Sequence, residues 1–216
     1  MLRLEQIRKL FRSGPDLVTA LSGIDIDLEK GDFLTVIGSN GAGKTTLLNV
    51  ISGMFPPTSG RVWIGGKDVT TIPAYRRARW IGRIVQDPLS GTAPKMTIAE
   101  NLALASKRSG RSLRLAITRG KRREMIERMR SLGMGLDRRL DDPVSLLSGG
   151  ERQALTVTMA TLACPNILLL DEHTAALDPA NAVMILELTR QFVERIRLTT
   201  IMVTHNMEQA IALGNR

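Results

Sequence analysis

The spacing of hydrophobic and polar positions changes along the 216-residue chain, and each change predicts an element. Residues 23–28 alternate weakly between apolar and polar side chains, which is typical of an antiparallel strand. Residues 33–37 form a short apolar run, typical of a strand buried on both faces. The pattern then becomes helical and ends at Gly53 and the proline pair 56–57. The apolar positions of this predicted helix are Leu47, Leu48, Ile51 and Met54.

The rest of the chain alternates between helix-type and strand-type segments. Residues 61–64 predict a short strand before a glycine turn, and helix-type segments dominate residues 88–148. Apolar runs return at residues 167–170 and 200–203, which predicts two further strands. Strands that alternate with helices favour a parallel sheet covered by helices, so we expect an α/β fold.

Composition limits the class of protein. Hydrophobic residues make up 43% of the chain and charged residues 24%, as expected for one soluble domain, or one domain with a subdomain. No run of 18 apolar residues predicts a membrane span, and residues 1–5 lack the apolar core of a signal peptide. A single cysteine, Cys164, excludes a disulfide framework and a cysteine-rich zinc site, and it fits a reducing cytosol.

The net charge of +9 suggests an acidic partner, for which ATP, an anionic membrane surface and nucleic acid are the candidates. Residues 107–123 carry eight Lys or Arg and no acid. This basic segment is interpreted either as a solvated or disordered face or as a specific anionic contact.

The strongest chemical motif is a phosphate-binding loop. It matches the pattern GxxxxGK[ST], and it lies between a predicted strand and a predicted helix, as the motif requires. Its residues, with the threonine that follows, are Gly38, Ser39, Asn40, Gly41, Ala42, Gly43, Lys44, Thr45 and Thr46. Backbone N–H groups and the helix N-terminus would face the phosphates, with Lys44 on the β- and γ-phosphates and Thr45 on Mg²⁺. The alternative is a glycine-rich turn with an incidental lysine, which this context disfavours.

A second motif places two acids at the end of an apolar strand. Asp171 and Glu172 follow the run 167–170, at the strand end where ligands of open α/β sheets bind. We expect Asp171 to hold Mg²⁺ and Glu172 to act as general base on a water. Alone, the pair would also fit two solvated acids.

The heptapeptide 147–153, LSGGERQ, is the most specific signal in the chain. Ser148 and Glu151 have the spacing of a capping box, which begins a helix in any protein. Gly149 and Gly150 need another reason, since glycine costs about 1 kcal/mol relative to alanine inside a helix. We therefore expect another group to approach this backbone closely.

Together these motifs resemble the nucleotide-binding subunit of the ATP-binding cassette (ABC) transporter family, over essentially the whole chain and in the family's order. The resemblance implies a P-loop NTPase (RecA-like) parallel-sheet core with an N-terminal antiparallel β subdomain and an inserted α-helical subdomain. It places the core and the β subdomain in residues 1–87 and 160–216, and the helical signature subdomain in residues 88–159, of a single 1–216 domain. Because related subunits continue into further short strands, a C-terminal truncation is also expected.

The resemblance implies further site residues. Gln86 matches a glutamine that touches Mg²⁺ and senses the membrane partner, although it also fits a polar turn residue. Asp178 matches the D-loop aspartate and is a ready helix N-cap before proline. His205 matches the switch histidine on the γ-phosphate. Phe11, with Val18 beside it, matches the aromatic that stacks on adenine, with a buried core phenylalanine as the alternative.

Two positions depart from the family pattern, which has proline and serine where this chain has His173 and Ala175. A His173 ring close to Glu172 would make the choice of a single base less secure. The stretch 171–178 resembles ATPases of bacterial amino-acid-type uptake systems.

The resemblance implies an ATPase that uses ATP and Mg²⁺ and forms a head-to-tail homodimer when ATP is bound. In that dimer Ser148, Gly149 and Gly150 of the partner subunit cover the γ-phosphate, with Glu151 and Asp178 counted among the nucleotide-binding residues. Integral membrane permease subunits and an extracytoplasmic substrate-binding protein are the expected partners, and the cytoplasmic face of the membrane is the expected location. The alternatives are an ABC exporter or lipoprotein-release ATPase, and a nucleic-acid-linked ABC ATPase. The last is disfavoured because long coiled coils, zinc cysteines and a second cassette are absent from the sequence.

Overall fold

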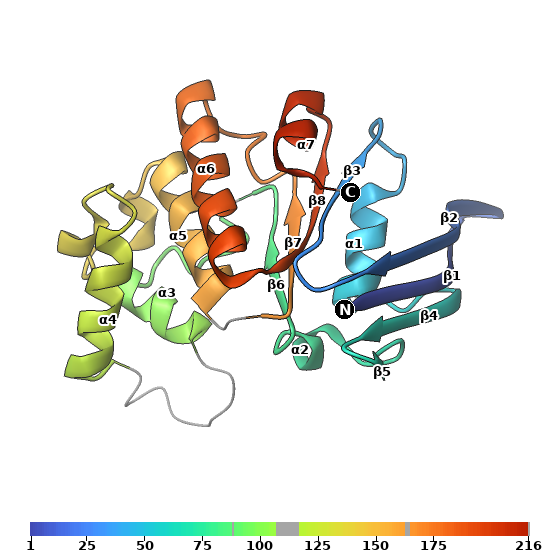
Figure 1. Cartoon of the computed structure of the whole chain (residues 1–216), viewed down its shortest axis with the longest axis horizontal. Coiled ribbons are helices and arrows are strands. Elements are labelled where there is room, and N and C mark those ends of the chain that lie inside the picture. The colour runs from blue at the N-terminus through green and yellow to red at the C-terminus, as the bar shows by residue number, and fades with distance from the viewer. Residues whose placement is uncertain (88, 107–116, 163–164, 216) are drawn as a thin grey trace. The chain divides into compact units, whose positions relative to one another are not determined.

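The computed structural model describes residues 1–87, 89–106, 117–162 and 165–215. The strands are β1 (Leu2–Ser13), β2 (Asp16–Leu28), β3 (Phe33–Ile37), β4 (Ser59–Ile64), β5 (Lys67–Asp68), β6 (Ile81–Ile84), β7 (Ile167–Asp171) and β8 (Thr199–Thr204) (Figure 1). The helices are α1 (Lys44–Ser52), α2 (Ala74–Arg77), α3 (Ile98–Ala105), α4 (Arg119–Arg130), α5 (Gly149–Leu162), α6 (Pro179–Ile196) and α7 (Met207–Leu213). Two short 3₁₀ helices occupy Leu136–Arg138 and Val144–Leu146.

The chain forms two compact units, which are described separately. The sheet unit consists of residues 1–83, 165–172 and 193–216, and the helical unit of residues 84–164 and 173–192. The division expected from the sequence, with an insert at 88–159, stays a prediction. Among the described residues, no helix has the length and apolar character needed to cross a lipid bilayer.

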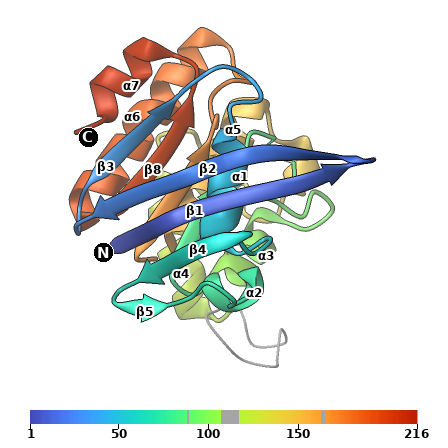
Figure 2. The ribbon, with the colours of Figure 1, turned by 90° about the vertical axis from the view of Figure 1, so that its right-hand side faces the viewer.

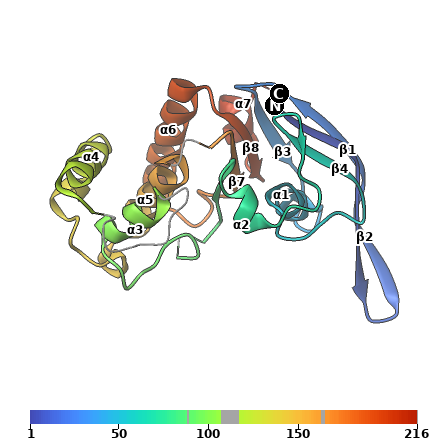
Figure 3. The ribbon, with the colours of Figure 1, turned by 90° about the horizontal axis from the view of Figure 1, so that it is seen from below.

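The sheet unit contains an antiparallel and a parallel sheet. The first has the strand order β2-β1-β4-β5, and its long β1–β2 hairpin is seen in Figure 2. The second has the order β3-β8-β7-β6, with β3 and β7 both parallel to β8. Helix α1 lies between the two sheets (Figure 3). The expected α/β fold, with a parallel core and an N-terminal antiparallel β region, is confirmed.

The core of the sheet unit contains side chains from both sheets and from α1. Because α1 is packed in this core, the position of the loop that precedes it is fixed. Its fully buried members include Leu2, Val62, Leu48, Ile51, Ile167 and Ile201. Burial of each such side chain stabilises the fold by about 1.5–3 kcal/mol.

One strand differs from its expected environment. Residues 33–37 form β3 as predicted, but β3 is at the edge of its sheet among the described strands, and Ile37 is 44% exposed. The expectation of burial on both faces was wrong for β3, in which only Phe33 is buried, whereas the five residues of β7 are all buried. An apolar run does not tell which position in the sheet a strand takes.

Helix α1 ends at Ser52, before Gly53 as the sequence predicts, so Met54 lies beyond the helix and is exposed. A buried arginine completes the ending. Gly53 adopts a left-handed conformation with φ +79°, which glycine accepts without penalty. The guanidinium of Arg77 then donates to the carbonyls of Val50 and Ile51, at 2.8 and 2.7 Å, and to those of Thr70 and Ile72. Burial lowers the pKa of Arg77 to about 10, so the side chain stays charged at neutral pH.

The helical unit packs α3, α4 and α5 around a core of its own, with members Ile98, Leu102, Met129, Leu136, Val144 and Leu155. Helix α3 begins with a capping box between Thr97 and Glu100. The expected helical character of residues 88–148 is thus confirmed for the part that the structure describes. Of the basic segment, residues 107–116 lie outside the described residues, as do Pro88 and Cys164, and α4 begins within the remainder at Arg119.

Candidate nucleotide-binding site

The phosphate loop joins β3 to α1 in the sheet unit. Gly41 and Gly43 have φ angles of +82° and +83°, which only glycine adopts readily. A Cβ on Gly43 would also overlap the carbonyl oxygen of Ala20 on β2. Glycine at position 43 is therefore required both by its conformation and by the close packing of β2.

Lys44 lies at the N-terminus of α1 with its side chain folded back over the loop. Its Nζ donates to the carbonyl oxygens of Gly38 and Ser39, at 2.7 and 2.9 Å. It also lies 3.9 Å from Oε1 of Glu172. The ammonium group thus rests inside the curl of the loop, where an anionic group would meet it.

Thr45 and Asp171 are brought together across 126 positions of sequence. The Thr45 hydroxyl donates to Oδ1 of Asp171 at 3.1 Å, and Asp171 ends β7 beside the strand β8. Within the part of the chain that the structure describes, no three His, Cys, Asp or Glu side chains gather as a metal site. A hydroxyl and a carboxylate oxygen side by side nevertheless fit Mg²⁺, which takes few protein oxygens and completes its shell with phosphate and water.

Glu172 lies between two basic groups. Besides Lys44 near Oε1, Nδ1 of His205 lies 3.5 Å from Oε2. Glu172 has a φ of +46°, an uncommon conformation for a residue with a side chain, and its N–H donates to the Val203 carbonyl at 3.0 Å. The backbone therefore aims this carboxylate at the end of the parallel sheet rather than along β7.

His173, the next residue, has the opposite environment. Its ring is 2% exposed in the helical unit, with Nε2 3.4 Å from the Thr189 hydroxyl. Its carbonyl accepts from the Gln153 side chain at 2.5 Å. Burial lowers the pKa of His173 to about 4, so the imidazole is neutral at neutral pH and brings no charge that could perturb Glu172.

Phe11 and Val18 face each other across the β1–β2 hairpin. They are 38% and 51% exposed, so Phe11 is not the buried core phenylalanine that the sequence left open. The ring meets Phe55 edge-to-face at 5.4 Å, and Lys9 Nζ lies 5.1 Å from its centroid. An exposed aromatic on this hairpin remains available for stacking.

The helical unit holds the LSGGERQ segment at the start of α5. The capping box is present, because the Ser148 N–H donates to Glu151 at 2.8 Å and the Glu151 N–H donates to the Ser148 hydroxyl at 3.2 Å. Glu151 is held further by Arg139 at 2.8 Å. Ser148 and Gly149 are exposed, whereas Gly150 is buried.

The two glycines differ in what surrounds them. A Cβ on Gly150 would lie 2.6 Å from Oδ1 of Asn181, whereas a Cβ on Gly149 would make an ordinary 3.7 Å contact with Leu177. The expected close approach to the bare backbone is therefore made, at Gly150, by a side chain of the same unit. The neighbours of Gly149 within its unit do not require a glycine.

Asp178 and Gln86 also lie in the helical unit. Asp178 precedes α6 and accepts from the N–H of Asn181 at 3.2 Å and from its side chain at 2.6 Å, so its expected role as N-cap is confirmed. These hydrogen bonds, from the side chain above all, hold the pKa of Asp178 below its usual range. Gln86 is exposed on the loop that follows β6.

The structure thus gathers Lys44, Thr45, Asp171, Glu172 and His205 at one end of the parallel sheet. Sequence reasoning missed Arg83, whose guanidinium lies 3.2 Å from Asp171. Its only signal in the sequence is a charged residue within the otherwise uncharged strand 81–84.

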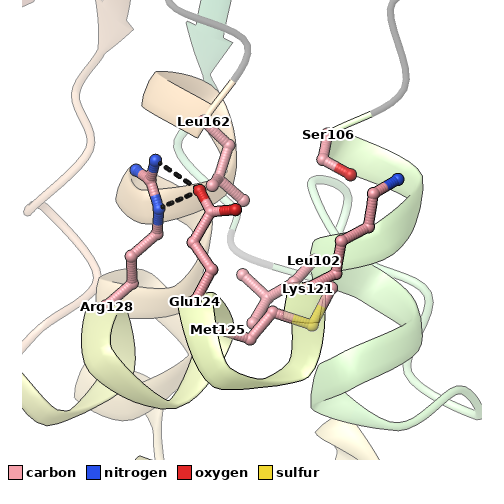
Figure 4. Close-up of a pocket in the computed structure, with 7 residues that line it drawn as sticks. All are labelled: Leu102, Ser106, Lys121, Glu124, Met125, Arg128 and Leu162. Atoms are coloured by element: carbon pink, nitrogen blue, oxygen red, sulfur yellow. Dashed lines mark hydrogen bonds and ion pairs between the residues drawn. The ribbon is translucent and has the colours of Figure 1, made fainter. Parts of the chain in front are cut away.

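A separate pocket of about 240 Å³ lies between α3, α4 and α5 of the helical unit (Figure 4). Leu102, Met125 and Leu162 give it an apolar wall, and Glu124 pairs with Arg128 at 2.9 Å across its rim. None of the residues expected to bind nucleotide lines this pocket.

A strand, a glycine-rich loop and a helix, with an acidic pair at the end of a parallel strand, define a P-loop nucleoside triphosphatase. The chain belongs to the ABC transporter family, whose sequence pattern matches residues 21–175. Within that family it is an ATP-binding and ATP-hydrolysing protein.

Several relatives carry transport names. The chain is 42% identical over 216 residues to the tyrosine transport ATP-binding protein of Clostridioides difficile, covering 98% of this chain and 86% of the relative. It is 35% identical to the glycine betaine/carnitine/choline transport ATP-binding protein OpuCA of Bacillus subtilis, covering all of this chain and 54% of that protein. It is 34% identical to the methionine import ATP-binding protein MetN of Geobacillus kaustophilus, covering 96% and 59%. The chain thus spans less than two thirds of the length of the last two.

Solved structures that are similar to this chain are also ABC cassettes. A dimeric, post-hydrolysis structure of the cassette MJ0796 with ADP and phosphate superposes with a TM-score of 0.80 at 27% identity, covering 97% of this chain and 90% of that one. A second dimeric structure of MJ0796, a bacterial ABC transporter cassette, gives 0.81 at 27% identity, covering 98% and 90%.

Proposed function

We propose that this chain is the ATPase subunit of a bacterial ABC importer for amino acids or related small solutes. The transport names of its relatives support the substrate class. The observation that carries the proposal is the cluster at the end of the parallel sheet, where Lys44 and His205 flank Glu172 beside the phosphate loop. This is the set of groups that ATP hydrolysis needs.

The phosphate loop binds the triphosphate. Residues 38–46 wrap the β- and γ-phosphates with backbone N–H groups, and Lys44 turns from the carbonyls of Gly38 and Ser39 onto the phosphate oxygens. The adenine stacks on Phe11 beside Val18, since a base gains about 1–3 kcal/mol from an aromatic platform.

Thr45 and Asp171 would hold Mg²⁺, with Gln86 as a third contact. When bound, the ion would supply positive charge that offsets the charge developing on the phosphates. Asp171 takes part as an acceptor that the Thr45 hydroxyl has already oriented at 3.1 Å.

Glu172 is the general base. It accepts a proton from the water that attacks the γ-phosphorus, while the bond from phosphorus to the bridging oxygen breaks and ADP leaves with that electron pair. His205, largely exposed and 3.5 Å from Glu172, contacts the γ-phosphate and keeps the base in place. Lys44 moves away from Glu172 as it turns to the phosphate, which leaves the carboxylate free to take the proton.

The active form is a head-to-tail homodimer. The partner subunit's Ser148 and the partner subunit's Gly149 are exposed at the start of a helix, and they donate to the γ-phosphate held by the first subunit's loop. Glu151 fixes the helix start, and Asp178 lies beside the nucleotide of the facing site. Membrane permease subunits dock near Gln86 and the helical unit, and the closing of the ATPase dimer is transmitted to them there. A substrate-binding protein delivers the solute. The subunit is then cytoplasmic and peripheral to the membrane.

The test is Glu172→Gln, which keeps the shape of the side chain but not its basicity. We expect ATP turnover to fall by about 10²-fold or more, consistent with loss of a general base, and an ATP-bound dimer to accumulate. Turnover by phosphate release and dimer mass by light scattering are the measurements. The matched control is Glu208→Gln, an exposed acid on α7 of the same unit, which should leave both unchanged. Wild-type turnover in Glu172→Gln would remove Glu172 as the base.

A further inference from the structure

Arg83 forms an ion pair with the acid that ends β7. Its Nη2 lies 3.2 Å from Oδ2 of Asp171, while the other oxygen, Oδ1, accepts from the Thr45 hydroxyl. Both oxygens of this carboxylate are thus engaged within the sheet unit. A carboxylate held at two points keeps one orientation.

The pair differs from a surface ion pair because it is shielded from water. The side chains of Arg83 and Asp171 are only 20% and 9% exposed, so their attraction is screened less than at an open surface. Among the described residues, Arg83 is the only Lys or Arg within 4.0 Å of Asp171, as Lys44 is of the neighbouring Glu172, which also has His205 beside it. Each of the two acids therefore has a cation of its own.

The two cations are held differently. Lys44 is bound by carbonyls of the loop itself, so it can follow the phosphates. Arg83 is anchored to the middle and end of α1, through the Asn49 side-chain oxygen at 2.7 Å and the Ser52 hydroxyl at 3.3 Å. These anchors lie away from the loop, so Arg83 stays beside Asp171 when Lys44 moves.

We propose that Arg83 is a positioning residue that orients Asp171 and offsets its negative charge before the metal arrives. ATP can then bind without Mg²⁺, and the metal serves hydrolysis more than affinity. The inference rests on the proposed assignment of Asp171 to the Mg²⁺ site. Without Arg83, metal-free ATP would meet two acids, Asp171 and Glu172, of which only Glu172 has basic groups beside it, Lys44 and His205.

The test compares ATP binding with and without metal. A fluorescent ATP analogue is titrated into wild-type protein, Arg83→Met, Arg83→Gln and Arg83→Lys, once in excess EDTA and once in excess Mg²⁺. In EDTA we expect Arg83→Met and Arg83→Gln to weaken binding about tenfold, as for one unit charge roughly 10 Å away at an effective dielectric of about 20. The Arg83→Lys variant, which keeps the charge, should stay within about threefold of wild type. In Mg²⁺ all three should stay within about threefold, because the metal supplies the missing charge.

Two further measurements separate a fold effect from an effect on the site. Arg61→Met, at an exposed arginine of β4 in the same unit, is the matched control and should change neither titration. Melting temperatures show whether each variant folds. Arg83→Met also removes an Nε–H that lacks a partner among the described residues. Arg83→Gln retains a donor for Asn49, so at least one uncharged variant should fold.

The assignment of Arg83 is wrong if Arg83→Met and Arg83→Gln weaken binding equally in EDTA and in Mg²⁺, or if wild-type protein binds ATP only with Mg²⁺. A wild-type protein that fails to bind the analogue even in Mg²⁺ would instead contradict the nucleotide site itself.

Discussion

At the scale of single residues, two histidines with the same chemistry are given opposite tasks by their surroundings. His205 is largely exposed beside Glu172, where it can reach a ligand. His173 is buried in the helical unit, where only the neutral ring is tolerated because a charged ring would lose its hydration. The Thr189 hydroxyl donates to the Ile185 carbonyl at 2.8 Å, so its oxygen is left to accept from Nε2 of that neutral ring.

His173 should make the stability of the fold depend on pH. Its pKa is about 4 in the folded protein and about 6.5 when unfolded, so between these values the unfolded state binds the proton more readily. The contribution of the neutral His173 ring to the free energy of unfolding is then fully present above about pH 6.5. It is lost as the pH drops toward 4, by about 3 kcal/mol in total. Urea unfolding at several pH values measures this.

The variant that tests this expectation is His173→Gln. It should flatten the fall in unfolding free energy between pH 6.5 and 4. An equally steep fall in His173→Gln would assign the pH dependence to other groups.

At the scale of elements, the two adjacent glycines at the start of α5 are needed for different reasons. Gly150 leaves room for Asn181, which Asp178 holds in place at the start of α6. Gly149 is exposed and needs no such room within its unit. We therefore propose that glycine is needed at position 150 for packing within the subunit and at position 149 for contact with the facing subunit.

Alanine substitutions separate these reasons. Gly150→Ala should destabilise the protein by about 1–3 kcal/mol, the usual cost of overpacking, and Asn181→Ala in the same chain should restore most of that loss. Gly149→Ala should leave the melting temperature unchanged but lower ATP turnover at least about tenfold, as for a lost transition-state contact. Thermal melts and phosphate release measure both. The assignment fails if Gly149→Ala melts early with normal turnover, or if Asn181→Ala does not rescue Gly150→Ala.

Much of the fold follows from local sequence, because each predicted element is bounded by its own signals. Gly53 ends α1 where the helical pattern stops, and the acids after 167–170 mark the end of β7. The exposed edge position of β3 could not be predicted, since it depends on which strands pair. Arg83 could not be assigned either, because its partner Asp171 is 88 positions away and only the fold brings them together.

At the scale of the whole molecule, the proposed site is composite, since one subunit supplies the phosphate loop and the other the start of α5. This arrangement predicts complementation between two inactive variants. Lys44→Ala removes the phosphate contact, and Gly149→Arg fills the exposed face that meets the other subunit. A mixed dimer places both defects in one site and leaves the second site intact.

An equal mixture of these variants should therefore regain ATP turnover that neither has alone, up to roughly a quarter of the wild-type rate if assembly is random and the sites are independent. Phosphate release at matched total protein measures it. Lys44→Ala mixed with the double variant Lys44→Ala/Gly149→Arg is the control and should stay inactive. If the first mixture is as inactive as its components, the head-to-tail arrangement is wrong.

Arg77 gives the phosphate loop a mechanical property. Helix ends normally fray, because their last carbonyls lack partners, and a frayed end deforms easily when a force acts on the helix. Here the guanidinium pins the carbonyls of Val50 and Ile51 to the chain around Thr70 and Ile72. The C-terminus of α1 is therefore held in place, so we expect a force that a phosphate exerts on its N-terminus to move α1 as a whole against the surrounding sheets rather than to unwind its last turn.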